Sequence, residues 1–314
     1  MSRPIAFFDA AMVDRLLDYP TLIERIRDSF LAPPVAPDRL MLTIPANAGA
    51  AESTLLVMPA LRAGSLIIVK LVTIHPDLGH RPQGALAATM LVLSAIDGSM
   101  CGVVDGHAIT RWRTAATSVL AARILARPDA RRLLLVGAGV IAHALGEAYT
   151  TAGSITEVAI WARRPEAATA LAARLCAAGI DATPVENLRL AAAKADIIST
   201  ATLSSRPLLF GADVRPGTHV DLVGGFRPNM RETDDALIRA ARIVVDSPRA
   251  LSEAGDLVDP IAAGVINATS ITSFDVALSQ PVERRANEIT LFKSVGLAAE
   301  DLAAAELLFE RLEK

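Results

Sequence analysis

The chain has 314 residues, of which 52% are hydrophobic and 4% aromatic, and its formal net charge is −3. This length allows two domains with a sizeable core, and an aliphatic, alanine-rich composition suits helices packed on a parallel sheet. The small negative charge excludes a basic field for nucleic acid or a membrane surface, so neither is expected as a partner.

The sequence carries no sign of a targeting or membrane segment. The N-terminal stretch reaches Asp9 too early for the apolar region of a signal peptide. The longest uncharged apolar run, Gly84 to Ile96, is shorter than the roughly 20 residues of a spanning helix. Cys101 and Cys176 lie far apart without metal-ligand spacing, which predicts two reduced, buried thiols. We therefore expect a soluble, cytoplasmic protein without a metal site.

The first part of the chain predicts a mixture of helices and strands. A short strand, "IAFF", is followed by helical segments, the second opening at Pro20, and then by the proline-rich loop "LAPPVAPDRL". From Thr54 to Asp105, short apolar runs alternate with turns, as strands do, and the Asp-Gly of "IDGSMCGVV" predicts a hairpin. The helix "TAATSVLAARILA" comes next and ends before Pro128.

From Arg131 onward the pattern changes to strands alternating with helices of roughly ten to fifteen residues, which predicts βαβ units and a parallel sheet. The C-terminal "ITLFKSVGLAAEDLAAAELLFERL" predicts one or two amphipathic helices that return to the first domain. The fold class is therefore α/β. A nucleotide-binding domain at residues 116–285 is inserted between two parts of an α+β domain, residues 1–115 and 286–314.

The motif Gly137-Ala138-Gly139-Val140-Ile141-Ala142 follows a predicted strand and opens a predicted helix. In a dinucleotide site the first glycine permits a tight turn and the second lets the backbone approach a pyrophosphate, while alanine is accepted at the third position. The strand, helix and following strand stand in the required order. Residues 116–285 are therefore predicted to be a Rossmann domain that binds a nicotinamide dinucleotide.

The end of the second strand of this domain, "EVAIWARRP", indicates which cofactor binds. An NAD site typically has an acid here for the ribose 2′-hydroxyl, whereas this chain has Ala162, Arg163 and Arg164. Two guanidinium groups suit the 2′-phosphate of NADP, although two surface arginines at a helix start would give the same pattern. We expect NADP(H) as the preferred cofactor, with NAD(H) as the alternative.

Three cations stand in apolar or loop surroundings in the first domain: Arg39, Lys70 and Arg113. A lysine within "LIIVKLV" is costly unless it meets an anion, but on an edge strand it would be unremarkable. Arg113 precedes Thr114 at the predicted helix start, where a guanidinium and the helix dipole could both attract a carboxylate. These residues predict a small carboxylate-bearing substrate. Their spacing in the sequence does not show whether the three side chains lie close together. His75 is the one histidine expected near them.

The sequence resembles the ornithine cyclodeaminase/mu-crystallin family over nearly its whole length. The stretches that carry the resemblance are "LLVMPA", "IVKLVTIHPD", "VVDGHAITRWRTAATSVLAA", "LLLVGAGVIA", "ADIISTAT", "GGFRPNMRETDDALI" and "ITLFKSVGLAAEDLAAA". The resemblance implies a homodimer in which the first domain and the C-terminal helices form the substrate site and the dimer contact. It also implies a Rossmann domain in the middle of the chain.

The resemblance also implies roles for individual residues. Arg39, Lys70 and Arg113 match the cations that bind the substrate carboxylate, and Lys70 and Arg113 are the expected catalytic pair. The positions that match cofactor-binding residues are Thr89, Thr114, Gly137, Gly139, Val140, Ile141, Arg163, Arg164, Thr202, Val223 and Ser294.

Two departures from the cyclodeaminases indicate a different reaction. Ornithine cyclodeaminases resemble this chain but carry acids at the positions of Leu56 and Phe226. Those acids would activate and position the amines of the substrate. An ω-amino group would meet an apolar wall here and remain unpaired. The stretch "VGGFRPNMRETDD" is instead similar to the mu-crystallin and ketimine-reductase branch.

These features predict NADPH-dependent reduction of a cyclic ketimine carboxylate, such as 1-pyrroline-2-carboxylate or 1-piperideine-2-carboxylate, to L-proline or L-pipecolate. Arg113, with Arg39 and Lys70, would hold the carboxylate, and Lys70 is the expected proton-handling group. Three alternatives stay open: ornithine cyclodeaminase activity, amination of pyruvate by an alanine-dehydrogenase-type reaction, and a mu-crystallin-like protein that binds NADPH and a ligand.

Overall fold

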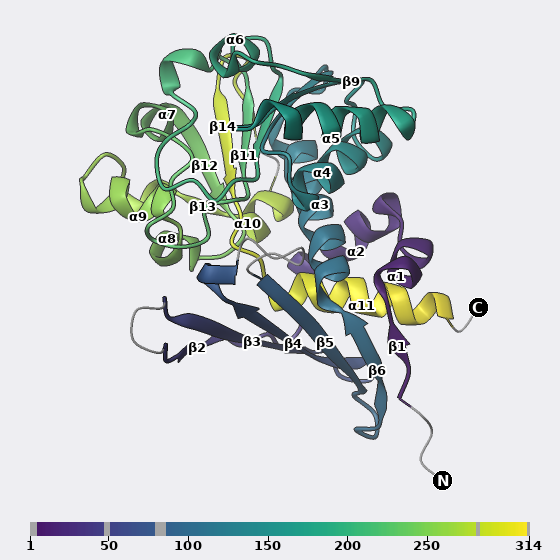
Figure 1. Cartoon of the computed structure of the whole chain (residues 1–314). Coiled ribbons are helices and arrows are strands. Elements are labelled where there is room, and N and C mark those ends of the chain that lie inside the picture. The colour runs from purple at the N-terminus through teal and green to yellow at the C-terminus, as the bar shows by residue number, and fades with distance from the viewer. Residues whose placement is uncertain (1–4, 47–50, 79–85, 281–282, 313–314) are drawn as a thin grey trace. The chain divides into compact units, whose positions relative to one another are not determined.

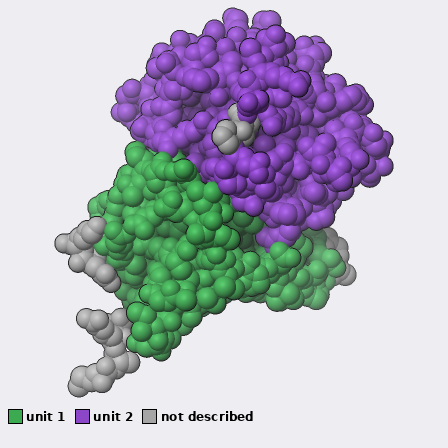
Figure 2. Space-filling view, turned by 180° about the vertical axis from the view of Figure 1, so that it is seen from behind, with its two compact units in different colours: residues 1–113, 297–314 green, residues 114–296 purple. Residues whose placement is uncertain are grey.

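The structure is a computed structural model of the chain, and it describes residues 5–46, 51–78, 86–280 and 283–312. The chain divides into two compact units, which Figure 2 distinguishes by colour: residues 1–113 with 297–314 (unit 1) and residues 114–296 (unit 2). The first border lies beside the expected one at residue 115. The second lies after residue 296 rather than after residue 285.

Unit 1 contains a six-stranded sheet in the order β1-β6-β5-β4-β3-β2 (Figure 1). Neighbours from β2 to β6 are antiparallel, and β1 runs parallel to β6. Its strands are β1 (Phe7–Phe8), β2 (Leu40–Ile44), β3 (Ser53–Leu61), β4 (Leu66–Ile74), β5 (Leu86–Ser94) and β6 (Met100–Asp105). Its other elements are α1 (Ala10–Leu16), α2 (Tyr19–Leu31), the short 3-10 helix η1 (Pro76–Leu78) and α11 (Ala298–Leu312).

The two faces of this sheet differ in burial because alternate residues of a strand point to opposite sides. One face is buried, and α11 packs against β3 and β4 there and against α2. The alternate residues of β3 and β4 on the other face are only half-buried. On the edge strand β2, Leu40, Met41 and Leu42 are exposed. Unit 1 therefore has one covered and one open sheet face.

Helix α3 (Gly106–Leu125) begins earlier than expected. Its N-cap is Asp105, whose carboxylate accepts hydrogen bonds from the backbone amides of His107 (2.8 Å) and Ala108 (3.0 Å). Capping by an aspartate satisfies amides that have no partner within the helix. The prediction of a helix start at Thr114 is therefore wrong, and residue 113 lies two turns inside α3 rather than at its positive end.

Unit 2 is an eight-stranded, all-parallel sheet in the order β13-β12-β14-β11-β10-β7-β8-β9 (Figure 1). The strands are β7 (Arg132–Val136), β8 (Glu157–Trp161), β9 (Ala182–Pro184), β10 (Ile197–Thr200), β11 (His219–Leu222), β12 (Ala241–Val245), β13 (Thr272–Ser273) and β14 (Ile289–Lys293). The helices after α3 are α4 (Val140–Thr151), α5 (Pro165–Ala177), α6 (Leu188–Ala192), α7 (Asp235–Ala240), α8 (Ala250–Glu253), α9 (Gly255–Ala262) and α10 (Phe274–Ser279). Two short 3-10 helices, η2 (Gly211–Asp213) and η3 (Ala268–Ser270), complete the unit.

The predicted alternation of strands and helices is thus confirmed, with one correction. The segment from Ile289 to Lys293 is strand β14, inserted between β11 and β12, and only the segment from Ala298 is a helix. The five residues of β14 are all buried. A strand covered on both faces has no period-2 alternation, so its apolar run resembles the start of a buried helix.

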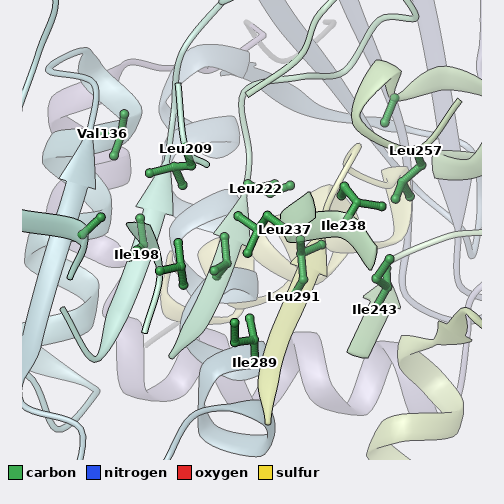
Figure 3. Packing of buried hydrophobic residues seen from close by; sticks show 14 of the residues in the cluster. Val136, Ile198, Leu209, Leu222, Leu237, Ile238, Ile243, Leu257, Ile289 and Leu291 are labelled. Atoms are coloured by element: carbon green, nitrogen blue, oxygen red, sulfur yellow. The ribbon is translucent and has the colours of Figure 1, made fainter. Parts of the chain in front are cut away.

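The core of unit 2 lies against this sheet, and Figure 3 shows part of it. Aliphatic side chains from adjacent strands meet those of the flanking helices, with few aromatic rings among them. The labelled members are Val136, Ile198, Leu209, Leu222, Leu237, Ile238, Ile243, Leu257, Ile289 and Leu291. This packing holds the carboxyl ends of the strands, where the predicted cofactor residues lie, on a rigid frame.

No helix among the described residues is long and apolar enough to cross a membrane.

Cys101 and Cys176 are both free thiols, but Cys101 is half-buried and Cys176 is exposed. The prediction that both thiols are buried is therefore wrong.

Candidate active site

The carboxyl ends of the unit 2 strands form the edge at which most of the predicted cofactor residues lie. The chain passes from β7 to β8 and β9 on one side and then returns to β10 on the other side of β7. Ligands of open parallel sheets bind at such a reversal. The glycine loop follows β7, Thr202 follows β10, Val223 follows β11 and Ser294 follows β14.

The glycine loop leaves room for a pyrophosphate. Gly137 has a φ of 121°, which L side chains rarely adopt, and a Cβ there would lie 2.6 Å from the carbonyl oxygen of Ala201. Gly139 is the N-cap of α4 and carries no capping side chain, and a Cβ there would meet nothing within 4 Å. The amides that open α4, at Val140 and Ile141, are typical of a phosphate site. These residues therefore fit a dinucleotide.

Arg163 and Arg164 follow β8 and are both exposed. Arg164 is the N-cap residue of α5, and its side chain makes no capping hydrogen bond. Guanidinium groups at a helix start can approach a phosphate from solvent. Both residues thus lie at the end of the second strand of the domain, where the ribose end of a dinucleotide binds in this fold.

A buried carboxylate, that of Glu232, links the loops after β10 and β11. Its Oε1 accepts hydrogen bonds from the backbone amide (2.8 Å) and hydroxyl (2.6 Å) of Thr202, and its Oε2 accepts from the Thr200 hydroxyl at 2.7 Å. Oε2 also accepts from the backbone amides of Gly224 (2.9 Å) and Gly225 (3.3 Å). Burial raises the pKa of Glu232 above its ordinary value. Glu232 therefore holds together two loops of the cofactor edge.

Two further buried acids act in the same way on the neighbouring loops. Asp246, which follows β12, accepts hydrogen bonds from the Ser294 hydroxyl (3.1 Å) and from the backbone amides of Val295 and Gly296 (both 2.7 Å). Asp256 accepts from the backbone amide of Glu232 at 2.8 Å, and its Oδ2 lies 3.7 Å from Nζ of Lys293. These contacts explain why a buried lysine and serine stand side by side in "LFKSVG".

These three acids were not predicted from the sequence. Glu232, Asp246 and Asp256 all lie in loops or at a helix start, where exposed acids are common, so their residue types alone carry no signal. Their burial follows from the way the strands are ordered in the sheet. A glycine pair followed seven residues later by an acid, as in Gly224-Gly225 and Glu232, was the available clue.

In unit 1, Lys70 lies at the centre of the buried sheet face. Its strand, β4, is paired on both sides, so the alternative of an exposed edge-strand lysine is excluded. Nζ lies 2.5 Å from Oδ2 of Asp301 on α11 and 3.3 Å from Oγ1 of Thr110 on α3. Burial lowers the pKa of Lys70 to about 8, with the nearby Arg113 cation adding to the shift and Asp301 opposing it.

Arg113 lies beside Lys70 and is also buried. Its Nη1 donates to Oε2 of Glu300 at 2.7 Å, and its Nε donates to Oδ1 of Asp301 at 3.2 Å. Two cations from β4 and α3 thus meet two consecutive acids of α11, and both acids are fully buried. Lys70 and Arg113 therefore do converge, and acids of this chain already accompany them.

The acids at residues 300 and 301 were missed in the sequence for an ordinary reason. Acids in the first turn of a helix are common because they favour its positive end, so Glu300 and Asp301 resembled surface residues. The signal that could have found them is their position in "GLAAEDLAAAELL", where small apolar residues surround both. A buried helix face that contains two acids requires cationic partners elsewhere in the chain.

Arg39 directly precedes β2, where Leu40 pairs with Val57, and the next pair of strands joins Met58 to Lys70. By this register Arg39 falls on the row of Met58 and Lys70, two strands and about 10 Å away. The three predicted anion-binding cations thus belong to one region of unit 1. Arg39 lies at the sheet edge, whereas the other two cations are central.

Thr89, Thr114 and His75 do not join this cluster. Thr89 pairs with Leu71, next to the pair of Lys70 and Met90, so it lies on the opposite, open face of the sheet. Thr114 is buried and is the first residue of unit 2. His75 follows β4, and its Nδ1 lies 2.8 Å from the Ser53 hydroxyl.

The two positions that depart from the cyclodeaminase pattern are Leu56 in unit 1 and Phe226 in unit 2. Leu56 is buried on the same sheet face as Lys70, and it pairs with Val72, two residues along β4. Phe226 is half-buried directly after the glycine pair that Glu232 holds, and the guanidinium of Arg227 lies 5.9 Å from the centre of its ring. Neither position offers an acid for an amine.

Comparison with known proteins shows the family of this chain. The model of the ornithine cyclodeaminase/mu-crystallin family matches residues 41–314. The chain belongs to this family. The resemblance inferred from the sequence is therefore confirmed, and the two-unit α/β architecture is that of known family members.

Several family members are similar over most of the chain. A Delta(1)-pyrroline-2-carboxylate reductase of Paracoccus denitrificans is 39% identical, covering 90% of this chain and 86% of that protein. The ketimine reductase mu-crystallin of Mus musculus is 35% identical over 81% of this chain and 79% of its own. A solved structure of the Thermococcus litoralis Delta(1)-pyrroline-2-carboxylate reductase, in complex with NADH and L-proline, is 29% identical with a TM-score of 0.91, covering 98% of each chain.

Proposed function

We propose that this family member is an NAD(P)H-dependent reductase of cyclic ketimine carboxylates, 1-pyrroline-2-carboxylate or 1-piperideine-2-carboxylate, with L-proline or L-pipecolate as the product. The observation that carries this proposal is the convergence of two buried cations, Lys70 on the sheet and Arg113 on α3, with the apolar Leu56 on the same sheet face as Lys70. Such a site suits a carboxylate attached to a ring of methylenes, without a distal amine. The similarity to reductases of this substrate class supports the same conclusion.

The roles of individual residues follow from their chemistry. The Arg113 guanidinium binds the substrate carboxylate, with Arg39 contributing from the sheet edge, and Glu300 keeps Arg113 in place. Lys70 supplies a proton to the imine nitrogen, because its pKa of about 8 lies near neutral pH. The nicotinamide cofactor supplies the hydride when it is bound. Gly137, Gly139 and the start of α4 hold its pyrophosphate.

Turnover of a panel of imino acids tests this function. Purified protein with NADPH should oxidise the cofactor rapidly when either cyclic ketimine carboxylate is added, as followed by the absorbance of NADPH. Pyruvate should require ammonia for any reaction, and L-ornithine without added reductant should release no ammonia. Absence of turnover on both five- and six-membered rings would refute the proposal. Ammonia release from L-ornithine would indicate a cyclodeaminase.

We further propose that NADP(H) is preferred over NAD(H), because Arg163 and Arg164 are exposed where the 2′-phosphate of NADP binds. Replacing both arginines by alanine should lower the ratio of kcat/KM for NADPH to that for NADH by at least about tenfold, since charge-assisted contacts to phosphate are lost. Arg174, on the last turn of the same helix, provides a matched control. An unchanged ratio would show that the two arginines do not bind the phosphate.

We also propose that unit 1 is the substrate and dimerisation domain, that unit 2 is the cofactor domain, and that the protein is a cytoplasmic homodimer. The half-buried sheet face of unit 1 and the exposed apolar residues Leu40, Met41 and Leu42 support a partner surface there. The two free cysteines support a reducing compartment.

A further inference from the structure

Two consecutive acids of helix α11, Glu300 and Asp301, contact the two buried cations of unit 1. Asp301 contacts both of them, through Oδ2 to Nζ of Lys70 at 2.5 Å and through Oδ1 to Nε of Arg113 at 3.2 Å. Glu300 is placed differently: its Oε2 lies 2.7 Å from Nη1 of Arg113. Asp301 is therefore the carboxylate that lies against Lys70.

The surroundings of Lys70 give this contact particular weight. Its cross-strand neighbours on β3 and β5 are Met58 and Met90, which do not titrate. Helix α3 presents the Thr110 hydroxyl and the Arg113 cation, and α11 presents the two acids. Burial and a neighbouring guanidinium both lower the pKa of an ammonium group. Contact with an anion opposes this shift and keeps the group protonated. Among these groups, Asp301 is the anion in contact with Nζ.

We propose that Asp301 is a positioning residue of the reaction: it holds the Lys70 side chain in one orientation and keeps it in the ammonium form that can donate a proton. This inference rests on the proposed function, in which Lys70 supplies that proton. In that reaction, hydride supplied by NAD(P)H would form the new C–H bond at C2 of the cyclic imine, and the electron pair of the C=N bond would pass to nitrogen. The nitrogen forms an N–H bond with a proton from Lys70, whose own N–H bond breaks. Lys70 is left as a neutral amine and regains a proton from solvent.

The first test is the pH dependence of kcat in two matched variants, Asp301→Asn and Glu300→Gln. Each removes one carboxylate charge from adjacent positions of α11, but only the first removes the contact with Lys70. The alkaline limb of the kcat profile should move to lower pH by about one unit or more in Asp301→Asn. Glu300→Gln should move it less and mainly raise KM. Titration of the substrate affects the unaltered enzyme and the two variants equally, so it cancels when their profiles are compared.

A second test observes Lys70 without any reaction. The sequence contains only four lysines, at positions 70, 194, 293 and 314, so lysine labelled with ¹³C at Cε gives few NMR signals. The Lys70 signal is assigned by its loss in Lys70→Met. We expect it to titrate near pH 8 in the unaltered protein and at lower pH in Asp301→Asn. This result does not depend on which substrate is reduced.

The outcomes separate the two proposals. If the unaltered protein reduces no cyclic imine but the Lys70 signal shifts in Asp301→Asn, the proposed function is wrong. The effect of Asp301 on the protonation of Lys70 is then still supported. If the alkaline limb and the Lys70 signal are both unmoved, Asp301 is only structural and the inference is overturned. An equal fall of kcat at every pH, without movement of the limb, has the same meaning.

Should Asp301→Asn fail to fold, Asp301→Glu retains the charge with a longer side chain. The inference then predicts an alkaline limb close to that of the unaltered enzyme and a kcat lowered about tenfold or more, because Nζ is displaced from its position. Unchanged kcat in folded Asp301→Glu would contradict a positioning role.

Discussion

Replacing Arg113 by methionine is expected to raise KM for the imino-acid substrate about 100-fold, equivalent to about 3 kcal/mol, because a charge-assisted contact with the carboxylate is lost. The Kd of NADPH should change little, since the glycine loop and the acids of the cofactor edge belong to unit 2, whereas Arg113 belongs to unit 1. Steady-state kinetics together with a fluorescence titration of NADPH measure both quantities.

Two controls make this result specific. Arg111→Met removes a cation from the same helix that pairs with Asp14 instead, and it should leave KM unchanged. Arg113→Met also leaves Glu300 and Asp301 without their guanidinium partner, which is costly for buried acids. The double variant Arg113→Met with Glu300→Gln restores part of the charge balance. If KM stays near its original value in these folded variants, Arg113 has a structural role only.

The second large effect is expected at Glu232. Replacing it by glutamine turns one of two accepting oxygens into a donor, although both oxygens face hydrogen-bond donors in the folded protein. Leaving buried donors without an acceptor should lower the free energy of unfolding by about 3 kcal/mol. The loops at Thr202 and Gly224 should also lose their fixed positions, so the Kd of NADPH should rise about tenfold.

Asp234→Asn provides a matched control from the same loop. The Asp234 carboxylate caps α7 by accepting from the Leu237 amide and also accepts from the Gly211 amide (both 2.9 Å), whereas the Glu232 carboxylate binds Thr202 and Gly224. Because asparagine is also a good N-cap residue, both stability and the Kd of NADPH should change little. Chemical denaturation and a cofactor titration check both variants. Equal Kd values for Glu232→Gln and the unaltered protein would show that the buried carboxylate does not organise the cofactor edge.

The sequence alone was sufficient for the features that depend on neighbouring residues. The glycine loop from Gly137, the order of strands and helices after Arg131, and the strands between Thr54 and Asp105 all follow from turn chemistry and periodicity within short windows. Where local signals were overlooked, as with the cap at Asp105, the helix start was misplaced. The family resemblance rests on these same local stretches, and comparison confirmed it.

The tertiary structure decided which distant residues meet. Lys70, Arg113 and the acids at 300 and 301 converge because β4, α3 and α11 pack together, and no period or spacing in the chain encodes a contact between residues 70 and 301. The same holds for β14, which is a strand because β11 and β12 pair with it. Local propensity is a property of a few consecutive residues, whereas the partner of a buried charge is selected by the whole packing of the chain.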